Sequence, residues 1–133
     1  MTIQHIYNLV CSALFWGKPS YRKEFYVTAT PVVKILKQDA NGIVVLEEDA
    51  NNLGFPTIEI SQDFPFKEGV TVVLHIHQPS LNLTGTGVSF VWTAGGAVNT
   101  ATSVILDGYQ TVSLTVHDAT PNNLIFKIVG KVL

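Results

Sequence analysis

Apolar and polar residues alternate along most of the chain with a period of two, the pattern of β-strands that bury one face. In the second half the apolar positions fall into five groups. These are Val70, Val72, Leu74 and Ile76; Val88, Phe90 and Trp92; Thr102, Val104 and Leu106; Val112, Leu114 and Val116; and Leu124, Phe126, Ile128 and Val132. Shorter runs cover residues 32–37, 43–47 and 57–60. The pattern predicts an all-β fold, an antiparallel β-sandwich or jelly-roll-like barrel of about eight strands.

One turn signal stands out between the first two of the shorter runs. Asp39-Ala40-Asn41-Gly42 separates two β-branched stretches, and both Asn and Gly tolerate a positive φ. Asn-Gly in this context is a strong signal for a β-hairpin. We therefore expect residues 32–37 and 43–47 to pair as neighbouring antiparallel strands.

The beginning of the chain does not share the alternation. Residues 1–24 end in a polar stretch from Gly17 to Glu24, so we expect an N-terminal arm or linker over 1–24 and one β-sandwich domain over 25–133. The apolar spacing within the arm allows a short amphipathic helix, whereas the Phe15-Trp16 pair is equally compatible with a strand. The alternative is a segment that folds back on its own core.

The chain has few charged residues: 14% of its 133 residues are charged and 47% are hydrophobic, whereas about a quarter of a typical domain is charged. From Gly69 to Leu106 there is no Asp, Glu, Lys or Arg. Hydroxyl groups replace charge on the strand faces away from the core. The positions concerned include Thr71, Ser89, Thr111, Ser113 and Thr115. Such a surface can pack against another chain without burying an ion, which predicts a subunit interface, with Phe15 and Trp16 as aromatic anchors in the arm.

Composition excludes several classes of function. The net charge of −2, the pI near 6.0 and only eight Lys and Arg argue against nucleic acid as a partner. The single cysteine, Cys11, has no internal partner for a disulfide, so we expect synthesis in a reducing, intracellular compartment. The apolar run from Ile6 to Trp16 is shorter than the ~20 residues of a membrane span and lacks the flanks of a signal peptide, so we expect no membrane contact.

His75-Ile76-His77 is the sharpest candidate for a metal site. Residues two apart on a strand project to one face, and His117 on a later strand offers a third nitrogen. The run from Gly69 to His77 resembles the first part of the cupin motif, a glycine, five residues and then His-x-His. The glutamate expected a few positions further on is absent from residues 78–87. The favoured interpretation is therefore histidines on a surface or interface, and the metal site is the alternative.

Other candidate chemistry is weaker. Glu47-Glu48-Asp49 lacks the ladder of an EF-hand loop and indicates a solvated turn. No serine stands in a Gly-x-Ser-x-Gly elbow, and Cys11 has no protease signature, so we predict neither an enzyme nor a cofactor. Trp16, Trp92 and Tyr109 would suit a carbohydrate-binding module, but Trp92 shares its face with Val88 and Phe90 and is expected in the core.

The stretch from Asn99 to Leu114, followed by Phe126-Lys127-Ile128-Val129-Gly130-Lys131, is rich in Thr, Ser, Val and Gly and contains the turn Asp107-Gly108. In this composition and turn type, the last third of the chain resembles small β-domains of tailed-bacteriophage virion proteins, of the capsid decoration (cement) or fibre type. The resemblance implies a frequently trimeric subunit without catalytic residues.

We therefore predict a non-enzymatic decoration subunit, located in the virion, that stabilises the shell. Its partners would be its own copies, as a homotrimer, and another virion protein such as the major capsid protein, on which the arm docks. Two alternatives remain: a small cupin-like metal-binding protein, and a tail or fibre attachment or carbohydrate-binding β-module.

Overall fold

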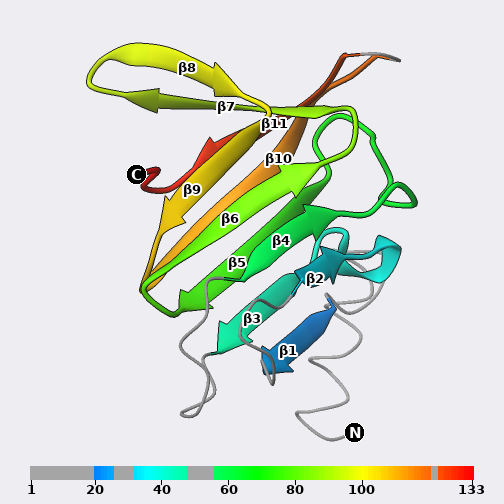
Figure 1. Ribbon diagram of the computed structural model, residues 1–133. Coiled ribbons are helices and arrows are strands. Elements are labelled where there is room, and N and C mark those ends of the chain that lie inside the picture. Colours follow the sequence, from blue (N-terminus) through cyan, green and yellow to red (C-terminus); the bar gives the residue numbers. More distant parts are fainter. Residues whose placement is uncertain (1–19, 26–31, 48–55, 121–122) are drawn as a thin grey trace, which may run out of the picture.

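The computed structural model describes residues 20–25, 32–47, 56–120 and 123–133, which form two β-sheets (Figure 1). The strands are β1 (Tyr21–Phe25), β2 (Val32–Ile35), β3 (Ile43–Glu47), β4 (Thr57–Ile60), β5 (Thr71–His77), β6 (Ser80–Gly85), β7 (Val88–Ala94), β8 (Ala97–Ala101), β9 (Ser103–Asp107), β10 (Gln110–Thr120) and β11 (Asn123–Val129), with one 3-10 turn, η1 (Lys37–Asp39). The prediction of an all-β fold is confirmed.

Along the first two-thirds of the chain, successive strands belong alternately to the two sheets. The larger sheet has the order β1-β3-β5-β10-β11-β7-β8, and the smaller has the order β2-β4-β6-β9. From β1 to β7 the chain changes sheet at every connection, so β1, β3 and β5 are parallel neighbours, as are β2, β4 and β6. β7 is also parallel to its neighbour β11. The remaining four pairs, β5 with β10, β6 with β9, β7 with β8 and β10 with β11, are antiparallel. The sheets are mixed, and the prediction of a purely antiparallel arrangement is wrong.

Apolar side chains from both sheets belong to one buried cluster. Its largest fully buried members are Phe90, Phe126, Ile35, Leu46, Ile58, Ile60, Leu74, Ile76, Leu81, Leu83, Leu106 and Leu114. Phe64, which follows β4, packs its ring 5.6 Å from that of Phe126. Each side chain of this kind contributes about 1.5–3 kcal/mol when it leaves water, so the shared layer stabilises both sheets at once.

The Asn41-Gly42 turn joins the two sheets. β2 pairs with β4, and β3 pairs with β1 and β5, so the predicted hairpin is wrong. Asn41 does adopt a positive φ of 57°. Its N–H donates to the Thr71 carbonyl oxygen over 2.6 Å, and its Oδ1 accepts the Thr71 N–H over 3.1 Å, which ties the turn to the start of β5. Gly42 is needed because a Cβ there would collide with the Oγ of Ser20.

Three of the eleven described strands, β1, β6 and β8, differ from the pattern used for prediction. β1 lies where a linker was expected. Its charged residues Arg22, Lys23 and Glu24 are not typical of a strand, but an edge strand tolerates charge. In β6 both Ser80 and Leu81 are buried, which breaks the alternation, and none of the β8 side chains is buried, so burial leaves no pattern there. Residues 1–19, the rest of the expected arm, lie outside the described residues.

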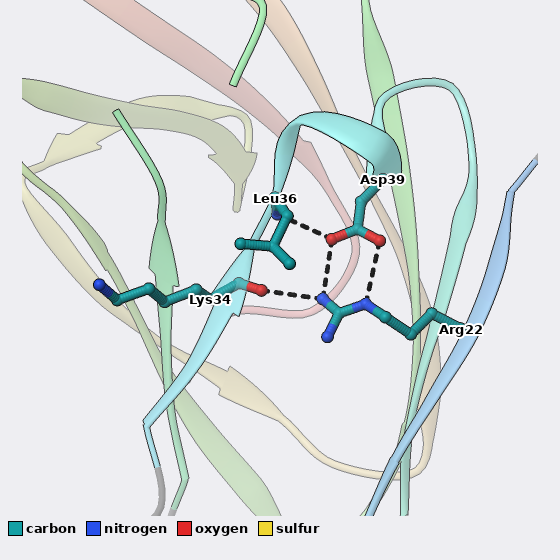
Figure 2. A network of polar contacts seen from close by, with 4 residues as sticks. All are labelled: Arg22, Lys34, Leu36 and Asp39. Carbon is teal, nitrogen blue, oxygen red and sulfur yellow. Dashed lines mark hydrogen bonds and ion pairs between the residues drawn. The ribbon is translucent and has the colours of Figure 1, made fainter. Parts of the chain in front are cut away.

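A buried ion pair joins the edge strands of the two sheets (Figure 2). Arg22 of β1 donates from Nε to Asp39 Oδ1 over 3.0 Å and from Nη2 to Oδ2 over 2.7 Å. The same Nη2 donates to the carbonyl oxygen of Lys34 in β2, and Asp39 Oδ2 also accepts the N–H of Leu36. Only 1% of the Asp39 side chain is exposed. The bidentate contact therefore satisfies a carboxylate that water does not reach.

Replacing Asp39 by alanine will remove the bidentate contact with the Arg22 guanidinium and the acceptor of the Leu36 N–H. Because these hydrogen bonds are charge-assisted and meet at a carboxylate that is almost fully buried, we expect D39A to lower the free energy of unfolding by about 3 kcal/mol. Urea unfolding followed by circular dichroism measures the change. Asp63 is exposed, so D63A is the matched control and should stay within about 0.5 kcal/mol of the parent. Equal effects of the two variants would contradict the structural role of the pair.

The C-terminal segment is held against β9 by a second ion pair. Asp107 Oδ2 lies 3.1 Å from Lys131 Nζ, and its Oδ1 accepts the N–H of Gly108. The hydrogen bond from Lys131, followed by that from Gly108, holds the pKa of Asp107 below its ordinary value of 3.8. The N–H of Leu133 donates to the carbonyl oxygen of Ile105, so the same segment covers the free edge of β9.

The lowered pKa of Asp107 makes stability depend on pH. The ionised form is favoured in the folded state, so its contribution is present above the unfolded pKa and is lost as pH falls through the lower folded value. We expect D107N to destabilise the protein at pH 7 and to have a smaller effect at pH 2. Urea midpoints of both proteins at the two pH values test this. An effect of D107N that does not shrink on acidification would contradict it.

Candidate functional site

The candidate site is the outward face of the seven-stranded sheet. Along each strand, side chains that point into the core alternate with side chains that point to this face. Val72, Leu74, Val112 and Leu114 point into the buried cluster, so the residues between them point outward. The five hydroxyl residues predicted to form an interface all lie on this face. They are Thr71 on β5, Ser89 on β7, and Thr111, Ser113 and Thr115 on β10.

Three of these hydroxyl groups bond to cross-strand neighbours. The Oγ1 atoms of Thr71 and Thr115 lie 2.9 Å apart, and the Oγ1 of Thr111 lies 2.8 Å from Nδ1 of His75. A hydroxyl that already has a partner within its own sheet can be covered by another surface at little cost. The face is therefore polar in composition but suited to contact with protein.

An apolar row crosses the same face and was not among the predicted site residues. The ladder pairs place Tyr21, Ile43, Val73, Ser113 and Val129 side by side on five neighbouring strands. The row contains no charge, and Tyr21 and Val129 are 66% and 59% exposed. A signal for it exists in the sequence: Ile43-Val44-Val45-Leu46 is apolar on both faces, which is typical of strands covered on both sides.

The nearest charged side chains that the structure describes on this face, Lys23 and Lys127, lie in the rows on either side of it. Lys23 Nζ and Glu47 Oε1 are 3.1 Å apart, and Nδ1 of His77 lies 3.5 Å from the same Oε1. Lys127, which is exposed, lies in the next row between Thr115 and Val91. A long lysine side chain can keep its ammonium in water while its stem covers apolar surface, so this cation is compatible with a contact at its border.

The three histidines of the alternative metal site do not come together. His75 and His77 point outward from β5, not into the core, and His75 pairs with Thr111 in the ladder. His117 lies at a β-bulge of β10, six residues beyond Thr111, which at ~3.3 Å per residue is about 20 Å along the strand. Within the described ranges, no group of three or more His, Cys, Asp or Glu is placed to hold a metal ion.

A shallow surface pocket of about 330 Å³ lies beside these histidines. Its lining residues are His77, Tyr109, Gln110 and Thr111. The described lining residues include one imidazole and one phenol, and the hydroxyl of Thr111 bonds to Nδ1 of His75 at the border of the pocket. Trp92 packs against the core as expected, Tyr109 is 70% exposed, and Phe15 and Trp16 lie outside the described residues.

No helix long and apolar enough to cross a membrane occurs in the part of the chain that the structure describes. Comparisons with protein-family models, with curated proteins and with solved structures gave no match for this chain. The geometry of the outward face is therefore the basis for a functional assignment.

Proposed function

We propose that this chain is a non-enzymatic structural subunit of a virion, a capsid decoration (cement) protein that associates with its own copies through the outward face of the seven-stranded sheet. The observation that carries the proposal is the uncharged row from Tyr21 to Val129, which crosses five strands and exposes large apolar side chains. Exposed apolar patches with a polar rim mark interaction sites. The two sheets would stack as a β-sandwich around their common core.

The size of this face bears on how the subunit would assemble. Five strands about 4.8 Å apart and a strand of seven residues give a patch of roughly 24 by 23 Å, or about 550 Å². A standard interface buries about 800 Å² on each partner, and permanent assemblies bury more. A homotrimer on the shell would need further contact area. On the shell, additional contact area outside the homotrimer would come from the N-terminal arm, which would dock onto another virion protein such as the major capsid protein.

A lysine at the centre of the row tests the interface. Ser113 lies between Val73 and Val129, so S113K would bury an unpaired ammonium between copies. We expect S113K to weaken self-association at least tenfold in sedimentation velocity while leaving the thermal unfolding of the subunit within a few degrees. Ser103 is exposed on the smaller sheet, which makes S103K the matched control. Equal association of S113K and S103K would contradict the assignment of this face.

A deletion tests the arm, and the structure dictates where it should end. Removing residues 1–24 would also remove most of β1, the partner of β3, so the informative deletion is 1–19. We expect the shortened chain to fold, to keep its self-association and to lose a co-purifying virion protein, identified by mass spectrometry of complexes from the native source. Retention of that protein by the shortened chain would contradict docking by the arm. An inventory without virion proteins would overturn the virion assignment.

A further inference from the structure

β8 is the free edge of the larger sheet that carries none of the usual protection. Sheet edges are normally protected by charge, proline, a bulge or a covering segment. Of the four edge strands in the described sheets, β1 has three charged residues, β2 contains Lys34 and is bonded by Arg22, and β9 is covered by the C-terminal residues. The sequence of β8 is Ala-Val-Asn-Thr-Ala, without charge or proline.

The hairpin of β7 and β8 extends beyond the rest of the sheet (Figure 1). Residues 93–98 at its tip are all exposed, and Val98 is 72% exposed. Gly95 and Gly96 have φ values of 60° and 78°, the positive angles of a type I′ turn, which suits a two-residue hairpin loop. No strand or loop of the described chain pairs with the outer edge of β8.

The register shows which backbone groups face that edge. A two-residue loop closes on a hydrogen-bonded pair, here Ala94 with Ala97. Bonded and non-bonded pairs alternate along an antiparallel ladder, so Asn99 bonds to Trp92, whereas the N–H and C=O groups of Val98 and Thr100 point to the open edge. Four backbone groups are therefore available to a further strand.

We propose that β8 pairs antiparallel with β8 of a second copy, about a two-fold axis at Asn99. In this register Val98 faces Thr100 of the other copy, and Ala97 faces Ala101. The match is self-complementary: two β-branched residues of similar size flank the centre, small residues lie outside them, and no charge meets its like. The contact would join two seven-stranded sheets into one continuous sheet.

This contact deepens the proposed assembly and is separate from the outward face. Five residues at ~3.3 Å each give a contact of about 17 Å, far smaller than a standard interface. The edge pairing would therefore be weak in solution and would act beside the face contact within a larger assembly. Because the two contacts use different residues, each can fail without the other.

Disulfide trapping tests the register. At a two-fold axis through Asn99 the two Cα atoms of this residue would be about 4.5 Å apart, within reach of a disulfide, whereas the two Ala97 positions would be about 13 Å apart, beyond it. With Cys11 replaced by serine, we expect N99C to form a covalent dimer on mild oxidation and A97C to remain monomeric. Equal dimer yields from both variants, or none from N99C, would overturn the proposal.

Amide hydrogen exchange keeps the test independent of the cysteine variants. In the otherwise unchanged S113K protein, in which the face contact is disabled, the amides of Val98 and Thr100 should exchange several-fold more slowly as the protein concentration rises from micromolar to millimolar. V98P removes one of the outward N–H groups, and it should abolish the protection of Thr100, whereas V98A should retain it. Exchange independent of concentration would overturn self-pairing, and protection only in the presence of another protein would assign the edge to that partner instead.

Discussion

The two sheets depend on one buried apolar layer, because neither sheet is continuous in the sequence. From β1 to β7 each strand is followed by a strand of the other sheet, so every parallel pair requires the chain to pass through the opposite sheet first. Such pairings are costly in loop entropy until the common core is buried. We infer that the sheets form together around this cluster, in which the rings of Phe90 and Phe126 stack with their centroids 6.2 Å apart.

The two edges of the larger sheet differ in how they are protected. At the end formed by β1 and β2, Arg22 and Asp39 bond the edge strands of both sheets to one another. At the other end of the larger sheet, β8 has neither charge nor cover. The uncharged stretch from Gly69 to Leu106 includes this edge and much of the core, so its composition has two causes. Part of it is buried within the subunit, and part is exposed where we propose contact between copies.

Alternation along the sequence predicted most strands because it reports directly which face is buried. It could not predict which strands pair. Asn41-Gly42 has the composition of a hairpin turn, yet it connects strands of different sheets and lies beside Ser20 and Thr71. The same limit applies to the site. That the hydroxyl residues point away from the core follows from alternation, whereas the row through Tyr21 and Val129 follows only from the ladder register. The separation of His117 from His75 is likewise a property of register, which spacing in the sequence does not contain.

The central claim is that the outward face of the larger sheet is covered by another copy of the chain. The mass of the unmodified protein in solution tests it most directly, by sedimentation equilibrium from low to high micromolar concentration. We expect a mass that is a multiple of the 14.5 kDa of one chain, with dissociation only at the lowest concentrations. A mass of one chain throughout that range would contradict it.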